Sequence, residues 1–229
     1  MAFREAHGIY NDSSYNTYKD LYLGDYFKIQ DGTYNATWMV AHFDYYWNKG
    51  NDDNLFDNRG VVLIPRTLCS VHKMKDTDIG TTGAYKASLA HTTICPAIAT
   101  ALQTVLGSYL LSPHKMITNN MSNNIPSMAG LGWNGASSYF EWVDNNCILP
   151  NEMQIFGSPI NSSSFYDVGE ANQKLAVFNF INTVEYARAS FWVRDVVDQL
   201  SYGLISNYGN VSAYDATGSF GTRPLIYIG

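Results

Sequence analysis

The side chains that most often carry chemistry are spread thinly along this chain. A zinc-binding helix places two histidines a turn apart so that both face one ion. No two of the five histidines have that spacing: His7, His42, His72, His91 and His114. The cysteines are odd in number and form no Cys-x-x-Cys motif: Cys69, Cys95 and Cys147. This pattern predicts buried thiols, no cofactor and no metal, and leaves open only a metal site assembled from distant positions.

Carboxylates are the second candidates, as an acid and base pair for glycoside cleavage. Such a pair needs two carboxyl groups held about 5 to 9 Å apart across a cleft. The residues considered are Glu152, Glu170, Glu185, Asp195 and Asp198. Solvated charges in loops and at strand ends are the ordinary state of such residues. The chain has no phosphate-binding glycine loop, no Gly-x-Ser-x-Gly and no His-Glu-x-x-His. We therefore expect a protein that is not an enzyme, with glycan hydrolysis as an alternative that cell-wall assays would test.

Two arginines stand inside apolar runs near the C-terminus. Arg194 follows Trp192 in Phe-Trp-Val-Arg-Asp-Val, and Arg223 precedes Pro224 in Gly-Thr-Arg-Pro-Leu-Ile. A guanidinium in such a place needs carboxylates, carbonyls or an aromatic ring around it. We expect Trp192, Arg194 and Arg223 to organise the fold by joining loops to a sheet. The alternative is a site for an anionic ligand.

Short strands must position these side chains. Residues 190 to 229 consist of apolar or alternating runs separated by Gly, Asn, Asp and Ser clusters, which predicts an antiparallel meander. Upstream runs predict strands over 26–29, 37–43, 60–65, 109–112, 140–143 and 147–149. The Asp31-Gly32 pair predicts a hairpin between the first two of these strands.

Helices and loops complete the predicted elements. Apolar residues at helical spacing predict a helix over 96–106, with Pro96 in its first turn and Gly107 just after its end. Shorter helical segments are expected over 84–90 and from Pro150, and a loop over 67–84. Residues 118 to 138 predict a long loop of Asn, Ser, Met and Gly, which is the leading candidate for a contact loop.

The C-terminal motifs resemble a known family. The Trp-x-Arg strand at 192–194, the small-residue meander and the Gly-x-Arg-Pro at 221–224 look like the C-terminal half of a C-type-lectin-like domain. That sub-family includes formylglycine-generating enzymes and variable phage tropism proteins. Residues 171 to 229 look similar to head-fibre, decoration or minor structural proteins of phages, and the strand order upstream extends the resemblance over most of 23–229. It implies an α+β fold with twisted antiparallel sheets, one or two packed helices and long loops.

The chain departs from two activities of that family. Calcium-dependent lectins carry a Glu-Pro-Asn or Gln-Pro-Asp triplet and a Trp-Asn-Asp triplet. The nearest stretches here match neither: Pro150-Asn151-Glu152 and Trp47-Asn48-Lys49. Formylglycine-generating enzymes use cysteines near their C-terminal part, whereas this chain has none after Cys147. We expect neither calcium-dependent sugar binding nor oxidase activity.

Composition points to assembly with other proteins. Only 15% of residues are charged, whereas 14% are aromatic, including 17 tyrosines, which suits a surface covered by partners. A net charge of −6 without a basic cluster disfavours nucleic acid. We expect no membrane span and no secretion signal, and hence synthesis in a host bacterial cytoplasm. Residues 1 to 20 form an expected arm that anchors the 21–229 domain, with three tyrosines for contact: Tyr10, Tyr15 and Tyr18.

The resemblance and the composition together favour a virion protein. We expect a non-enzymatic structural protein on the particle surface, as a capsid decoration or head-fibre component with capsid or fibre proteins as partners. A homo-oligomer is expected, and a trimer suits fibres. Host or mucus glycans would contact exposed aromatic residues, for which the candidates are Tyr202, Tyr208, Tyr214 and Trp133. The alternative is a receptor-binding protein at the tail tip that recognises a cell-wall polysaccharide.

Overall fold

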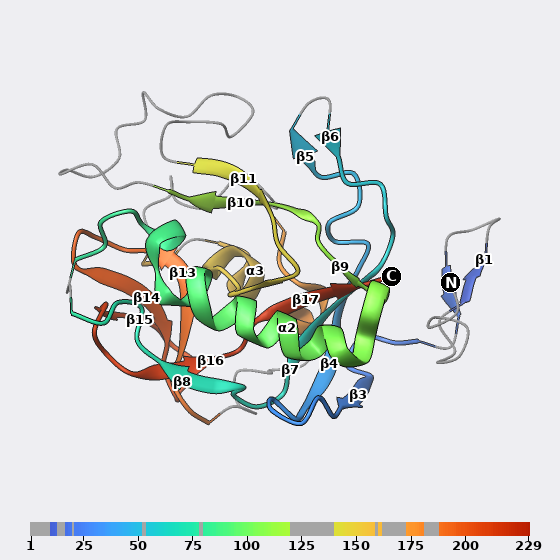
Figure 1. Ribbon diagram of the computed structural model, residues 1–229, viewed down its shortest axis with the longest axis horizontal. Helices are drawn as coiled ribbons and strands as arrows, with labels where there is room; N and C mark the ends of the chain where they lie inside the picture. Colours follow the sequence, from blue (N-terminus) through green and yellow to red (C-terminus); the bar gives the residue numbers. More distant parts are fainter. Residues whose placement is uncertain are drawn as a thin grey trace.

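The fold is a sheet-rich α+β arrangement with few helices (Figure 1). The computed structural model describes residues 10–12, 17–19, 21–51, 54–77, 80–119, 140–158, 160–161, 173–180 and 188–229. Two larger sheets, three two-stranded sheets and one helix of 12 residues account for most of the regular structure described. The predicted α+β class is confirmed at this level. None of the described helices is long and apolar enough to cross a membrane.

The first sheet is antiparallel and contains most of the predicted upstream strands. Its order is β12 (Cys147–Ile148), β17 (Leu225–Ile228), β7 (Val61–Pro65), β4 (Ala36–Phe43) and β3 (Tyr26–Ile29), and β9 (Leu110–Leu111) also pairs with β17. Strands β7 and β17 are buried along their whole length, as their unbroken apolar runs require. The predicted hairpin joins β3 to β4. Gly32 has φ +85°, and Asp31 Oδ1 accepts hydrogen bonds from the backbone N–H groups of Thr33 and Tyr34.

The second sheet corrects the predicted C-terminal meander. Its order is β15 (Val211–Asp215), β14 (Ser201–Ile205), β13 (Phe191–Val196), β16 (Phe220–Thr222) and β8 (Ser70–His72). Only β13, β14 and β15 form a meander. Strand β16 returns to the other side of β13 and pairs with it in parallel, and β17 leaves for the first sheet. Strand β8 lies in a segment that was expected to be a loop. It was not predicted because three residues are too few to show the alternation that marks a strand.

The predicted helix is α2 (Cys95–Leu106), and Gly107 ends it with φ +55°. A π-helical turn, η2 (Ala90–Ile94), precedes it, and the Cys95 N–H donates to the carbonyl five residues back. This wider turn suits Pro96, which has no N–H for a normal helical bond. The helix expected over 84–90 is instead a 3₁₀ turn, η1 (Tyr85–Ala87), followed by η2.

Short elements fill the gaps between the sheets. Helix α3 (Glu152–Phe156) occurs where a helical turn was expected, and Asn151 and Gln154 cap its start reciprocally. A 3₁₀ turn, η5 (Ala176–Asn179), and η3 (Gly107–Tyr109) are the other short helical segments described. Antiparallel pairs join β10 (His114–Thr118) to β11 (Phe140–Asp144) and β5 (Gly50–Asn51) to β6 (Asn54–Leu55). Strand β10 was not predicted, and residues 120–138 of the expected contact loop lie outside the described residues.

The N-terminal segment contains a hairpin where a single extended arm was expected. Strand β1 (Tyr10–Asp12) pairs with β2 (Thr17–Lys19), so that Asn11 lies opposite Tyr18. In Figure 1 these strands lie to one side of the two larger sheets. Tyr15, the third tyrosine expected to make contacts here, lies outside the described residues.

One hydrophobic core joins both large sheets to α2. It contains Trp38 of β4, Ile226 of β17, Leu102 of α2 and Trp192 of β13. In Figure 1, α2 runs across β17 and β7. A smaller cluster forms on the other face of the second sheet, where Phe191 and Ile205 pack against Ile155 of α3. Elements distant in sequence are therefore held in fixed relative positions.

Candidate functional site

The tyrosines expected to bind a ligand do not form one surface. Tyr202 is fully buried in β14 and its hydroxyl donates to the Ala84 carbonyl over 2.8 Å, so its expected role at an exposed tip is wrong. Side chains alternate between the two faces of a strand, and Tyr202 points to the core face. Tyr208 is 85% exposed in the turn between β14 and β15. Tyr214 is 47% exposed, and its ring packs edge-on against Phe220.

Tyr208 and Tyr214 are also too far apart to form a single platform. Tyr208 lies in the turn that the Ser206 N–H closes on the Asn210 carbonyl. Tyr214 lies opposite Tyr202, about 10 Å along the strand from the start of β15. Trp133, the fourth candidate, lies outside the described residues.

Trp192 and Arg223 each join separate elements, and Arg194 is buried in β13. The Trp192 indole N–H donates to the His72 carbonyl over 2.9 Å, which ties β13 to β8. Arg223 Nε donates to the Pro65 carbonyl over 3.0 Å, and its guanidinium lies 5.1 Å from the centre of the Phe191 ring. Burial lowers the pKa of Arg223 to about 10, so it stays protonated at neutral pH. Arg194 is fully buried, and its backbone N–H donates to the Pro150 carbonyl.

Of the five carboxylates considered as an acid and base pair, the three whose side chains are described accept hydrogen bonds from backbone N–H groups. Asp195 and Glu152 are buried, where solvated charges were expected. Asp195 Oδ2 accepts from the Glu152 N–H at the start of α3, and Glu152 Oε2 accepts from the N–H groups of Ile160 and Asn161. Asp198 Oδ1 accepts from two N–H groups in the turn between β13 and β14. Glu170 and Glu185 lie outside the described residues.

Histidines and cysteines within the described residues form no cluster of the kind that could hold a metal ion. His42 Nδ1 accepts the Ala176 N–H over 2.9 Å, and burial lowers the pKa of His42 to about 4. Cys95 and Cys147 are fully buried free thiols, as expected. A hydrogen bond joins them, and burial raises the pKa of Cys147. Cys69 is only partly buried, and its pKa is raised to about 12. His7 lies outside the described residues.

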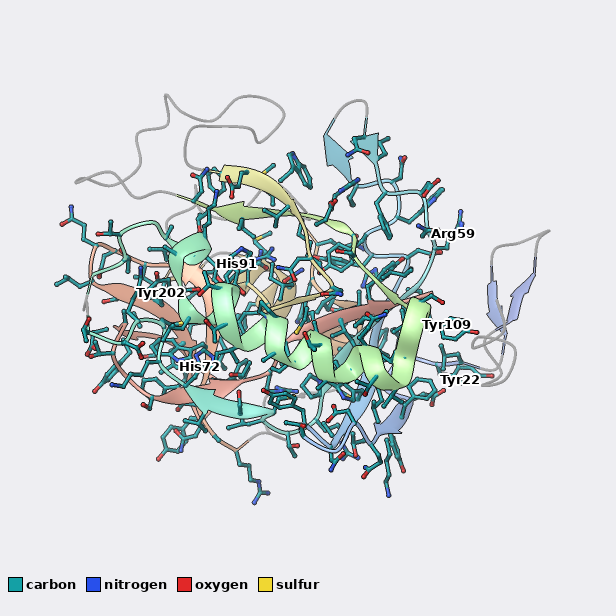
Figure 2. All side chains as sticks on the ribbon, viewed as in Figure 1. Tyr22, Arg59, His72, His91, Tyr109 and Tyr202 are labelled. Atoms are coloured by element: carbon teal, nitrogen blue, oxygen red, sulfur yellow. The ribbon has the colours of Figure 1, made fainter. Side chains whose placement is uncertain are left out.

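A groove of about 670 Å³ lies between α2 and the turn that joins β11 to β12. One wall is a face of α2, and the other is the turn. His91 lies near the start of the helical segment, below β11 in Figure 2. The lining residues are His91, Pro96, Ala99, Thr100, Gln103, Thr104, Asp144, Asn145 and Asn146. This volume falls in the range of small-molecule sites, and most of these side chains can form hydrogen bonds.

The turn wall of the groove is fixed from several sides. The buried Lys115 ammonium donates to the Asn145 carbonyl and lies 5.0 Å from the centre of the Tyr46 ring. Asn145 Oδ1 accepts the Cys147 N–H over 3.0 Å. The Asp144 carboxylate pairs with His114 across the β10–β11 ladder. Backbone and side chains of the turn are therefore held in place before any ligand arrives.

His91 lines the groove as a neutral side chain at neutral pH. Burial is the main cause that lowers its pKa below the usual value of 6.5; the negative charge of Glu141 opposes this effect, and the positive charge of Lys86 adds a smaller lowering. Its ring packs on Tyr85, with ring centres 5.4 Å apart, and Nδ1 lies 3.5 Å from the Asn145 amide nitrogen. A neutral imidazole offers one donor and one acceptor.

Sequence reasoning did not find this groove. Thr100, Gln103 and Thr104 have the three- and four-residue spacing of one helix face, so a polar stripe was visible. The approach of residues 144–146 to that stripe depends on the pairing of β12 with β17 and on the packing of α2, for which the sequence carries no local signal.

The chain was compared with protein-family models, curated proteins and solved structures, and none of them matches it. Its class is therefore defined by its own geometry: an α+β domain with two core-joined sheets and a polar groove beside its main helix. Function has to be inferred from the residues and from the motifs at 192–194 and 221–224.

Proposed function

We propose that this chain is a non-enzymatic structural protein on the surface of a phage particle. It acts as a capsid decoration or head-fibre component and binds host or mucus glycans. The 21–229 region forms a C-type-lectin-like domain, and the segment before it anchors the protein to capsid or fibre partners. The phage assignment rests on the Trp-x-Arg and Gly-x-Arg-Pro motifs. The assembly role rests on the edges of the two large sheets.

Exposed apolar side chains on three sheet edges support assembly with partners. Strands β3, β8 and β15 each end a sheet, and each carries a large exposed apolar side chain: Tyr26 at 58%, Val71 at 63% and Tyr214 at 47%. An edge strand also presents unpaired backbone groups, so proteins usually shield it or use it for contact. The fourth edge strand of the two large sheets, β12, is shielded because α2 packs beside it. Neighbouring subunits on a particle would cover the remaining edges.

Locating the protein on purified particles tests this proposal. Density that traces side chains is expected to place many copies on the head lattice, with β3 or β15 against a neighbour. A Tyr26→Lys variant should fold but join particles less well, whereas Val105→Lys, which changes an exposed apolar residue of α2 away from the sheet edges, serves as the matched surface control. Absence of the protein from purified particles would overturn the proposal.

A receptor-binding role at the tail tip is the second candidate, and the groove beside α2 favours it. A cell-wall polysaccharide offers hydroxyl groups that side chains such as Thr100, Gln103 and Asp144 can bind. Copies restricted to the tail tip would favour this function over decoration of the head. Both functions include glycan binding, and they differ in where the protein is placed.

A further inference from the structure

The α2 wall of the groove presents mainly hydrogen-bond acceptors, because most of its side-chain donors are already used. Thr100 Oγ1 donates to the Pro96 carbonyl over 2.9 Å, and Thr104 Oγ1 donates to the Ala101 carbonyl over 2.6 Å. The Gln103 amide nitrogen donates to the Gly107 carbonyl. What these three side chains have left to offer a ligand is two hydroxyl oxygens, the amide oxygen Oε1 and the second N–H of the Gln103 amide. None of these three oxygens accepts a hydrogen bond from the described part of the chain.

The turn wall adds a carboxylate and no cation. Asp144 is largely exposed and its Oδ1 pairs with His114, which leaves Oδ2 without a partner among the described residues. The Asn145 side-chain oxygen is occupied by the Cys147 N–H. No lysine or arginine is among the described residues that line the groove. The groove therefore combines acceptors on the α2 wall with the amide N–H donors of Asn145 and Asn146, and the charge that its described lining carries is negative.

We infer that this groove is a saccharide site that selects neutral or amino sugars over acidic ones. Sugar hydroxyls and ammonium groups are donors that match the acceptors of Thr100, Gln103, Thr104 and Asp144. The side chains of Pro96 and Ala99 supply apolar surface for the C–H face of a sugar ring. A carboxylate or sulfate on the sugar would meet Asp144 without a lysine or arginine beside it. This inference rests on the glycan-binding part of the proposed function and deepens it.

Other ligand classes fit the groove less well. A phosphate or nucleotide is bound best by cationic side chains, whereas the described lining residues include a carboxylate and no lysine or arginine. A metal ion needs several clustered His, Cys, Asp or Glu ligands, and no such cluster occurs within the described residues.

The test is binding of the purified full-length chain to an array of oligosaccharides ending in neutral hexoses, in glucosamine or in glucuronic acid. Binding to neutral or amino glycans is expected, with little to the acidic set. For the best glycan, a Thr100→Val and Thr104→Val double variant removes two acceptors while keeping side-chain shape. It should bind about four- to a hundredfold more weakly, at about two- to tenfold per lost hydrogen bond. Asp144→Asn, which removes the charge, should weaken binding by about tenfold or more.

Thr93→Val is the matched control, because this exposed hydroxyl belongs to the η2 turn but does not line the groove. It should bind as the unaltered chain does, and circular dichroism should show all variants folded. Binding that persists in both groove variants would place the site elsewhere and overturn the inference, while glycan binding itself would stand. No binding to any neutral or amino glycan, or preference for the acidic set, would also overturn it. Particle location tests the virion role separately.

Discussion

His42 is expected to make the stability of the protein depend on pH between about 4 and 6.5. Its Nδ1 accepts the Ala176 N–H, which holds the η5 turn against β4. Protonation would remove that acceptor. Burial lowers the pKa of His42 from 6.5 to about 4, and the opposing effect of Asp44 is smaller.

The sign and size of the effect follow from proton linkage. Between pH 6.5 and 4 the unfolded chain binds a proton at His42 and the folded chain does not, so stability falls as pH falls through this range. The full contribution is present above pH 6.5. A shift from 6.5 to about 4 corresponds to about 3 kcal/mol, and partial exposure of the ring reduces this to about 2 kcal/mol.

Urea unfolding at pH 7 and pH 4.5 measures this contribution. A His42→Asn variant is the comparison, because its amide oxygen can accept the Ala176 N–H but does not titrate. The free energy of unfolding of the unaltered chain should fall by about 2 kcal/mol more than that of the variant between the two pH values. His72 and His91, whose pKa values are also lowered by burial, titrate in both proteins and cancel in the comparison. Equal pH dependence in the two proteins would refute the role given to His42.

Three further changes test the core, the sheet and the N-terminal segment. Tyr202→Phe should cost about 1 to 3 kcal/mol in urea unfolding, because a buried carbonyl loses its partner, whereas Tyr208→Ala at the exposed turn should cost under about 0.5 kcal/mol. Equal costs would contradict these placements. Gly203→Ala should cost about 1 to 3 kcal/mol, because the added Cβ would lie 2.6 Å from Val193 Cγ2; a neutral result would mean that the sheet yields there. Deleting residues 1–20 should leave a folded domain that no longer joins particles, and undiminished incorporation would remove the anchoring role.

Elements with strong local signals were predictable from the sequence. The Asp31-Gly32 pair fixed the β3–β4 hairpin because glycine readily adopts the positive φ that the turn needs. Helix α2 was predicted from its apolar spacing and from Gly107, since both are properties of a single helix. Strand β7 was predicted because an unbroken apolar run followed by a proline matches a buried strand that ends there.

Elements defined by distant partners were not predictable in the same way. Strands β8 and β16 have three residues each, and their pairing joins Gly221 to Val71 far upstream. The parallel return of β16 depends on the path of the connection after β15, which turn residues alone do not encode. Tyr202 was misplaced for a related reason, because a tyrosine in a strand looks alike on either face, and the neighbouring elements decide which face is buried.

One wall of the groove follows from a local sequence pattern, and the other is positioned by contacts between distant elements. Its helix wall is a regular stripe and its turn wall is held by Lys115, His114 and the Cys147 backbone, so little conformational entropy is lost when a ligand binds. A few hydrogen bonds to a sugar in an open groove still give only weak affinity. A particle that carries many copies of the groove would bind a glycan surface through several copies at once, and avidity would then supply strength that one site lacks. Display on a virion and a weak saccharide site are in this sense complementary.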